Sequence, residues 1–384
     1  SPGVPLQIKP IREAYSEMIP VIGEVELAYR FKPEGVSILA ITGTNGKTTT
    51  TTLLQNILEK GGEKAVSGGN IGIALSSLID QMDEGYISTE MSSFQLDTIV
   101  DFRPHISGII NITPDHIDRH FNMEKYIRAK ARVFANQTGD DFTILNYEDA
   151  ITRELGKECR SQVYYFSTDR VLNKGAFVKD GVITIITSAG IHKICRVNEV
   201  LLRGKHNLEN VLCATMMAIL AGVDEKSIRE SLMTFPGVRH RLEQVACYNQ
   251  IFYINDSKAT NPESAIKALE SFSQPIVLIA GGRNKGCDFT DLARIIKERV
   301  KEIVLVGEAR SELKEAVMDA GFKNINEVED FPAAVSTAHS LASPGDIVLL
   351  APACTSWDMF ESYEQRGDLF CNLVHSLIEQ NNKG

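Results

Sequence analysis

The chain has 384 residues, of which 43% are hydrophobic, and a formal net charge of -10. This length exceeds that of one ordinary core and predicts two or three domains. So acidic a chain is a poor general ligand of nucleic acid or anionic membrane, although a few groups can still bind phosphates locally. No apolar run approaches the ~20 residues of a membrane span, and the start at Ser1 lacks the pattern of a signal peptide. The scattered cysteines, without C-x-x-C spacing, indicate reduced thiols in a cytoplasmic protein.

The first two thirds of the chain show the pattern of an α/β domain. Residues 36–42 form a short β-branched apolar run, which predicts a buried strand, and residues 48–60 repeat leucine and isoleucine at helical spacing. Further strands are predicted at residues 86–90, 106–112, 142–146 and 162–167, and helices at residues 123–135 and 208–221. Residues 175–203 alternate apolar runs with turn residues, which predicts an antiparallel stretch. We therefore expect a mostly parallel sheet with a β appendage.

A second series of elements follows a break near residue 234. Strands are predicted at residues 276–280, 302–306 and 347–351, and helices at residues 291–300, 311–320 and 333–341. This order predicts a smaller, doubly wound, Rossmann-like domain with functional loops at the carboxyl ends of its strands. The expected division is an N-terminal segment and linker over residues 1–33, a central domain over 34–234 and a C-terminal domain over 235–384.

A candidate phosphate-binding loop stands between the first strand and the first helix. Its residues are Gly43, Thr44, Asn45, Gly46, Lys47, Thr48 and Thr49. Glycines let the backbone approach phosphate oxygens, and free N–H groups at a helix start donate to them. Lys47 would reach the β and γ phosphates, and the Thr48 hydroxyl would bind Mg²⁺. The generic loop has a glycine where this chain has Ile41, so we expect a compact variant. The alternative is a polar turn before a helix.

Glu90 ends the predicted strand of residues 86–90 and suits a magnesium carboxylate ligand. An exposed strand-end glutamate is the alternative. His116 and His120 are spaced for one helical face, which would suit zinc. Pro114 makes the start of that segment a turn, and its aspartates fit Mg²⁺ beside phosphates better. A polar loop with capping roles is also possible for this segment.

Lys130 lies on the predicted helix of residues 123–135, and its pattern alone indicates a solvated lysine. Asn207 and Asn210 are three residues apart near a predicted helix start, so they face one way. They could contact a nucleobase edge, although capping is the default role for Asn207.

Polar clusters follow the strands of the predicted C-terminal domain. They comprise His240-Arg241, residues 255–261, residues 281–285 and residues 356–367. Basic residues there could bind an anionic substrate, and Asp256 could bind a ribose hydroxyl. Each cluster alone is typical of a solvated loop, but their shared place at strand carboxyl ends favours a site.

Together these segments resemble the Mur ligase family. The resemblance is carried by residues 43–48, Glu90-Met-Ser-Ser-Phe-Gln-Leu96, Asn111-Ile-Thr-Pro-Asp-His116-Ile-Asp-Arg-His120, His206-Asn-Leu-Glu-Asn210, residues 255–261 and Pro352-Ala-Cys-Thr-Ser-Trp-Asp358. It spans nearly the whole chain. The segments Asp256-Ser-Lys-Ala-Thr-Asn261 and Phe360-Glu-Ser-Tyr-Glu-Gln-Arg-Gly367 resemble the motifs of the family member that adds D-glutamate.

The resemblance implies a role for each matching residue. As catalytic residues it implies Lys47, Glu90, His116 and Lys130, and as metal ligands Thr48, Glu90, His116 and Lys130 as a carbamate. As nucleotide contacts it implies residues 43–49, Asn207, Asn210, Arg241, Asp256 and Lys258. On the substrate side it implies Asn70 for the muramoyl group and Thr260, Lys285, Ser356 and Tyr363 for the amino acid.

The implied reaction is ATP-dependent amide formation in peptidoglycan synthesis, with Mg²⁺. ATP phosphorylates the carboxylate of UDP-N-acetylmuramoyl-L-alanine, and the amine of D-glutamate displaces phosphate. We expect a monomer that binds no nucleic acid. Family members also have an N-terminal UDP-binding domain, of which residues 1–33 are expected to be the tail.

Other functions stay open at this point. A folylpolyglutamate synthase-like ligase or another Mur ligase would share the phosphate machinery and differ in the amino acid used. A nucleotide-binding protein without turnover belongs to a different class. A kinase or motor ATPase is disfavoured, because the second series of substrate loops has no use there.

Overall fold

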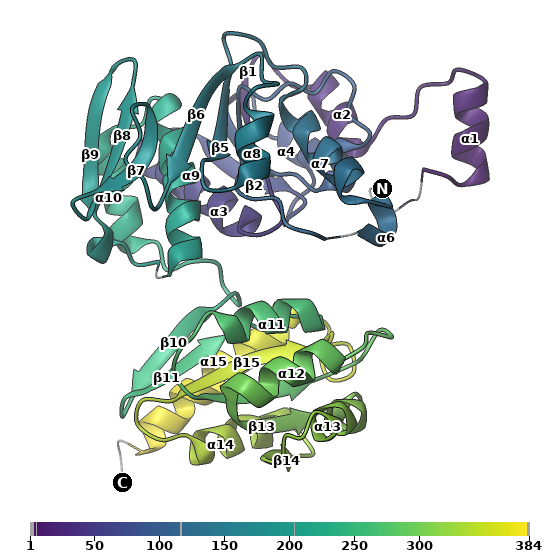
Figure 1. Ribbon diagram of the computed structural model, residues 1–384, viewed down its shortest axis with the longest axis vertical. Coiled ribbons are helices and arrows are strands. Elements are labelled where there is room, and N and C mark those ends of the chain that lie inside the picture. The colour runs from purple at the N-terminus through teal and green to yellow at the C-terminus, as the bar shows by residue number, and fades with distance from the viewer. Residues whose placement is uncertain (1–3, 5, 116, 203, 382–384) are drawn as a thin grey trace. The chain divides into compact units, whose positions relative to one another are not determined.

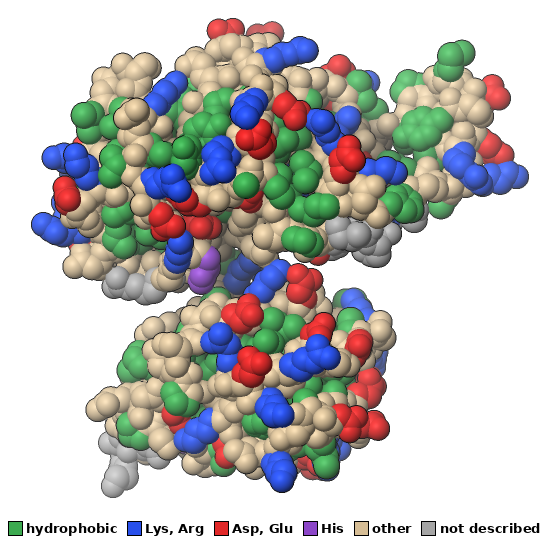
Figure 2. All heavy atoms as spheres, in the orientation of Figure 1, with side chains coloured by type: hydrophobic (Ala, Val, Ile, Leu, Met, Phe, Trp, Pro, Cys, Tyr) green, Lys and Arg blue, Asp and Glu red, His purple; other side chains and the backbone are tan. Residues whose placement is uncertain are grey.

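The computed structural model (Figure 1) describes residues 4, 6–115, 117–202 and 204–381. The chain divides into two units, Ser1–Pro236 and Gly237–Gly384. Each unit has its own sheet. On the face that Figure 2 shows, basic and acidic side chains are interspersed over both units.

The first unit contains a nine-stranded sheet in the order β2-β3-β1-β4-β5-β6-β7-β8-β9. Its strands are β1 (Gly35–Thr42), β2 (Ala65–Gly69), β3 (Glu84–Glu90), β4 (Ile106–Ile109), β5 (Phe142–Asn146), β6 (Gln162–Ser167), β7 (Gly175–Lys179), β8 (Val182–Thr187) and β9 (Gly190–Arg196). Pairing is parallel from β2 through β7, and antiparallel between β7, β8 and β9. The predicted β appendage is therefore the antiparallel edge of the same sheet.

Helices cover both faces of this sheet. The helices of this unit are α1 (Lys9–Ser16), α2 (Glu24–Arg30), α3 (Lys47–Lys60), α4 (Leu75–Ile79), α5 (Ser93–Leu96), α6 (Ile117–His120), α7 (Met123–Ala131), α8 (Ala150–Leu155), α9 (Lys205–Leu220) and α10 (Glu225–Thr234). The long helices α3 and α9 pack together in one apolar cluster, with Leu54 and Ile57 of α3 and Leu212 and Met216 of α9 fully buried. Helix α1 buries none of its residues and projects from the unit in Figure 1.

Helix α3 begins at Lys47 and continues with five threonines, which are poor helix formers. Four of them are buried. The Thr50 hydroxyl donates to the Gly46 carbonyl at 3.0 Å, and the Thr52 hydroxyl donates to the Thr48 carbonyl at 2.9 Å. Packing and these bonds, rather than local preference, therefore hold the start of the helix.

Glu26 of α2 fixes the segment that precedes β1. Its carboxylate is fully buried and accepts the backbone N–H groups of Val100 at 2.7 Å and of Asp101 and Phe102 at 3.0 Å. Arg30 donates to it at 2.9 Å. Burial raises the pKa of this carboxyl, but the N–H donors and Arg30 outweigh burial and leave the pKa below its usual value. The charged form of Glu26 therefore ties α2 to the loop after α5.

The second unit is a six-stranded sheet in the order β10-β11-β15-β12-β13-β14, parallel except for β10. Its strands are β10 (Glu243–Tyr248), β11 (Ile251–Asn255), β12 (Ile276–Gly281), β13 (Val300–Val306), β14 (Ile325–Glu327) and β15 (Ile347–Ala353). Its helices are α11 (Pro262–Glu270), α12 (Thr290–Arg299), α13 (Arg310–Asp319), α14 (Phe331–Leu341) and α15 (Tyr363–Asn381). Two apolar clusters, one beneath α11, α12 and α13 and one beneath α14 and α15, lie on opposite faces. This is the doubly wound arrangement.

The predicted fold class, a mostly parallel α/β domain followed by a smaller doubly wound one, is confirmed. Several element boundaries differ by a few residues, and two differences bear on the site. The strand predicted to reach residue 112 ends at Ile109, because the backbone beyond it bonds to other loops, as when the Ile112 N–H donates to the Asp149 carboxylate at 2.7 Å. The polar residues around Tyr363, expected to form a loop, begin the long helix α15.

Candidate active site

The loop of residues 43–48 joins the carboxyl end of β1 to the start of α3. Gly46 has a φ of 82°, in the left-handed region that favours glycine. A Cβ at this position would lie 2.1 Å from the Oδ1 atom of Asn210 on α9. The backbone therefore favours glycine at this position, and a larger residue would displace the Asn210 side chain.

The chain after β4 holds this loop in shape. The Asn45 N–H donates to the Oδ1 atom of Asn111 at 2.9 Å, and the Thr44 N–H donates to the Asn111 carbonyl at 2.9 Å. The Thr44 hydroxyl accepts the Thr113 N–H at 3.0 Å and lies 3.1 Å from the Tyr126 hydroxyl. The loop is thus preformed by bonds from two other segments.

Two lysines converge on the first residue of the loop. The Nζ atom of Lys47 donates to the carbonyls of Gly43 at 3.0 Å and Thr44 at 2.8 Å. The Nζ atom of Lys130 donates to the same Gly43 carbonyl at 2.7 Å. The positive charge of Lys47 thus lies beside a second basic group, which suits an anionic ligand such as phosphate.

Lys130 is only 2% exposed, so the alternative of a solvated lysine is wrong. Its Nζ atom also lies 4.7 Å from the centre of the Tyr126 ring. Burial and the charge of Lys47 hold the pKa of Lys130 well below its usual range. Burial therefore favours the neutral amine, which is the nucleophilic form of lysine, more than solvent would.

Glu90 ends β3 and is 3% exposed, which excludes the alternative of an exposed strand-end glutamate. The Thr48 hydroxyl donates to one carboxylate oxygen at 2.8 Å, and the Asn70 amide donates to the other at 2.9 Å. A buried carboxylate requires pairing or a metal. Glu90 also lies near enough to Lys130 to favour the charged form of that amine.

No group of three or more His, Cys, Asp and Glu side chains that could hold a metal ion exists among the described residues. A metal here would therefore need other ligands. The Thr48 hydroxyl and the Glu90 carboxylate offer hard oxygen atoms, and Mg²⁺ typically completes its shell with substrate phosphates and water. The residues present fit magnesium in that mode.

His116 lies outside the described residues. His120, its partner in the zinc alternative, is 5% exposed, and its Nε2 atom lies 2.9 Å from the Ser93 hydroxyl. Its ring stacks on that of Phe94 at 5.4 Å. These contacts describe a packed histidine and lend no support to zinc.

Asn207 and Asn210 lie in the first turns of α9, and the Asn210 amide donates to the Asn207 side-chain oxygen at 3.3 Å. The N-cap of α9 is Gly204, without a side-chain capping bond. The capping role expected by default for Asn207 is therefore wrong. Asn210 instead packs against the phosphate loop at Gly46.

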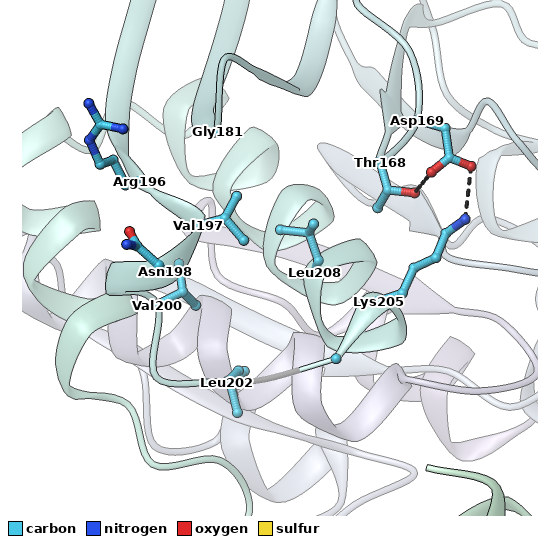
Figure 3. Close-up of a pocket in the computed structure, with 11 residues that line it drawn as sticks. Thr168, Asp169, Gly181, Arg196, Val197, Asn198, Val200, Leu202, Lys205 and Leu208 are labelled. Atoms are coloured by element: carbon cyan, nitrogen blue, oxygen red, sulfur yellow. Dashed lines mark hydrogen bonds and ion pairs between the residues drawn. The ribbon is translucent and has the colours of Figure 1, made fainter. Parts of the chain in front are cut away.

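A cavity of about 650 Å³, which the sequence did not predict, lies on another face of α9. Figure 3 shows Val197 and Leu208 facing each other, with the pair of Lys205 and Asp169 at one side, 2.8 Å apart. Lys205 lies two residues before Asn207, and Leu208 two residues before Asn210, so each pair points to nearly opposite sides of the helix. The residues predicted for the site do not line this cavity.

In the second unit, the predicted residues gather at the carboxyl ends of the strands. Asp256 follows β11, is 6% exposed, and accepts the Leu242 N–H at 3.1 Å. Burial raises its pKa to about 6, against the opposing effect of Arg241 and Lys258. The side chain is thus a buried carboxyl whose pKa lies above its usual value although two cations are in range.

Lys258 and Tyr363 are also brought together, with the Lys258 Nζ atom 5.8 Å from the Tyr363 ring centre. The Ser257 hydroxyl donates to the Tyr363 carbonyl at 2.8 Å. Arg366, which is 1% exposed, donates from Nε to the Ser257 hydroxyl at 3.0 Å and from Nη2 to the Ser257 carbonyl at 2.9 Å. Sequence reasoning placed Arg366 in a polar cluster but missed its part in fixing this loop. Thr260 lies beside these residues, with its N–H bonded to the Lys258 carbonyl at 2.9 Å.

Lys285 and Ser356 lie on the loops that follow β12 and β15. An isolated bridge joins Arg283 to Thr355. Ser356 is 2% exposed, and its carbonyl accepts the Phe360 N–H at 2.8 Å. The Lys285 Nζ atom lies 4.0 Å from the ring centre of Trp357.

Comparison with known proteins gives matches along most of the chain. Residues 41–218 match the Mur ligase middle domain, and residues 240–354 match the Mur ligase, glutamate ligase domain. The UDP-N-acetylmuramoylalanine--D-glutamate ligase of Pelotomaculum thermopropionicum is 49% identical over 98% of this chain and 83% of its own length. The enzyme of the same name from Clostridioides difficile is 44% identical over the same shares.

Solved structures of related folds agree. A crystal structure of MurF from Acinetobacter baumannii covers 93% of this chain and 78% of its own, with a TM-score of 0.65 and 20% identity. UDP-N-acetylmuramate-alanine ligase MurC from Thermotoga maritima covers 98% of this chain and 84% of its own, with a TM-score of 0.61 and 19% identity. At such identities these structures establish the fold alone.

Proposed function

Because the chain belongs to the Mur ligase family, we propose that it is the peptidoglycan ligase that adds D-glutamate to UDP-N-acetylmuramoyl-L-alanine with ATP. The observation that carries this proposal is the 49% identity to a D-glutamate ligase over 98% of the chain. Further relatives of that name, at 42% to 45% identity, support it.

The reaction joins a carboxylate and an amine, which needs activation of the carboxylate. ATP transfers its γ-phosphoryl group to the L-alanine carboxylate and leaves as ADP. The amine of D-glutamate then attacks the acyl phosphate, inorganic phosphate leaves, and the amine loses a proton. Such a site must hold three charged reactants in line and neutralise their charge.

The first unit supplies the phosphate machinery in this proposal. Lys47 and the N–H groups of residues 43–49 bind the phosphates, and Thr48 and Glu90 hold Mg²⁺, which neutralises phosphate charge when bound. Lys130 adds an anionic ligand as its carbamate, with His116 near the reacting groups. The buried bond between Thr48 and Glu90, 2.8 Å long, supports this assignment.

The remaining residues divide between nucleotide and substrates. Asn207, Asn210, Arg241, Asp256 and Lys258 contact the nucleotide in this proposal. Asn70 contacts the muramoyl group, and Thr260, Lys285, Ser356 and Tyr363 contact D-glutamate. Accordingly, residues 34–234 act as the ATP-binding domain and residues 235–384 as the amino-acid domain, while residues 1–33 belong to the linker.

The compartment and the oligomeric state are part of the same proposal. None of the helices in the described part of the chain combines the length and the apolar character of a membrane span. All seven cysteines are free thiols, which supports the cytoplasm. We propose that the protein acts there as a monomer.

The test is the amino-acid dependence of phosphate release. The protein, incubated with ATP, Mg²⁺ and UDP-N-acetylmuramoyl-L-alanine, should release phosphate when D-glutamate is added. Equal release with L-alanine, L-lysine or meso-diaminopimelate would refute the assignment. ATP binding without release under any of these conditions would favour a nucleotide-binding role.

A further inference from the structure

Trp357 is the single tryptophan of the chain, and 56% of it is exposed. It lies in the loop after β15, next to Ser356. Isolated exposed apolar residues are common and need no function by themselves. The observation that singles out this ring is the ammonium of Lys285, 4.0 Å from its centre.

Lys285 has no ion-pair partner among the residues that the structure describes, and its described contact is the tryptophan ring. Arg283, two residues earlier, differs: its guanidinium donates two hydrogen bonds of 2.8 Å to Glu308. The charge of Arg283 is thus neutralised within the chain, whereas that of Lys285 remains available to an external anion.

The two loops that carry Lys285 and Trp357 are fixed to each other. The Arg283 N–H donates to the Thr355 carbonyl at 2.9 Å, and the Thr355 N–H and hydroxyl donate to the Arg283 carbonyl at 3.1 and 3.0 Å. The Asn284 amide donates to Glu312 at 2.6 Å. The backbone positions of Lys285 and Trp357 are therefore fixed relative to each other.

We propose that Trp357 is a positioning residue for the amino-acid substrate, which holds the Lys285 ammonium where it meets the second carboxylate of D-glutamate. The face of an indole attracts an ammonium group electrostatically and leaves its other N–H donors free for a carboxylate. A free lysine side chain loses conformational entropy when it binds a ligand. The contact with the ring already orders Lys285 in the free protein, so less entropy is lost when the substrate binds. This inference rests on the proposed function.

The experiment compares two variants in the phosphate-release assay, with D-glutamate varied. Trp357→Leu keeps an apolar side chain but removes the aromatic face, whereas Trp357→Phe keeps a face. We expect Trp357→Leu to raise the KM for D-glutamate about two- to fivefold, the factor expected for an exposed cation–π contact. Its kcat and its KM for ATP stay unchanged, and Trp357→Phe restores most of the lost affinity.

Two controls accompany the variants. Lys174→Met removes another cation–π contact, at 3.9 Å from the Tyr164 ring, and should leave the KM for D-glutamate unchanged. In a Lys285→Met background, Trp357→Leu should have no further effect, because the two residues act as one unit. Since the chain has a single tryptophan, D-glutamate should also change the intrinsic fluorescence of the unsubstituted protein.

The outcomes separate the two proposals. An unchanged KM in Trp357→Leu, or an equal rise in Trp357→Leu and Trp357→Phe, would overturn the positioning role while D-glutamate-dependent release stands. If the unsubstituted protein releases no phosphate in response to D-glutamate, the proposed function fails and this inference fails with it.

Discussion

Replacing Lys130 with alanine tests the centre of the phosphate site. The change removes a buried amine that donates to the Gly43 carbonyl at 2.7 Å. A hydrogen bond from a neutral donor contributes about 0.5 to 1.5 kcal/mol, which corresponds to a factor of about 2 to 13. Because Gly43 begins the phosphate loop, we expect kcat/KM for ATP to fall by at least this factor, and further if the lysine also supplies a metal ligand.

The carbamate role adds a second expectation for the same position. The lowered pKa of Lys130 provides the neutral amine that reacts with carbon dioxide, so removal of bicarbonate should lower the activity of the unsubstituted protein. In Lys130→Ala, the space left by the side chain should admit formate or acetate, whose carboxylate replaces the carbamate and partly restores activity.

The assay is phosphate release at saturating substrates, with and without the added acid. Lys130→Met is the matched control, since its side chain fills the space and should block rescue. Full activity of Lys130→Ala would refute the role of this lysine. A loss of activity that no short carboxylic acid restores, in a variant that melts like the unsubstituted protein, would refute the carbamate.

Three further predictions concern the loop and two buried carboxyl groups. Gly46→Ala should weaken ATP binding more than tenfold, because its Cβ would meet Asn210 at 2.1 Å, whereas Gly62→Ala, at a similar φ of 84° but in open space, should bind ATP normally in calorimetry. Glu26→Gln should lower the free energy of unfolding of the first unit by about 3 kcal/mol. The pKa of Glu26 is lowered in the folded protein, so this loss of stability should be present above pH 4.5 and should vanish as the pH falls. Urea titrations at several pH values measure it. The pKa of Asp256 is raised from 3.8 to about 6, so the stability of the unsubstituted protein relative to Asp256→Asn should fall by up to about 3 kcal/mol as the pH rises through that range.

Much of the fold follows from local patterns in the sequence. The run that forms β1 is short, β-branched and buried, and the spacing of leucines in α3 marks its inner face. The glycines of the phosphate loop between them identify the loop without any knowledge of the sheet. These features are predictable because each one depends on neighbouring residues.

Other features depend on contacts between distant segments. Lys130 looks like a surface lysine in its own helix, but the folded chain buries it and bonds it to the Gly43 carbonyl, 87 residues away in sequence. The chain after β4 leaves the sheet because Asn111 bonds to the phosphate loop. Gly367 suggested a loop, but helix α15 runs through it. The glycine is explained by a distant contact, because a side chain there would lie 2.2 Å from the His240 ring.

The most direct test of the account is the fate of the carboxylate oxygens during the reaction. UDP-N-acetylmuramoyl-L-alanine labelled with oxygen-18 in its L-alanine carboxylate is incubated with the protein, ATP, Mg²⁺ and D-glutamate, and the released phosphate is analysed by mass spectrometry. Transfer of a phosphoryl group onto that carboxylate predicts one labelled oxygen in each phosphate released. Unlabelled phosphate, formed together with the D-glutamate adduct, would contradict it.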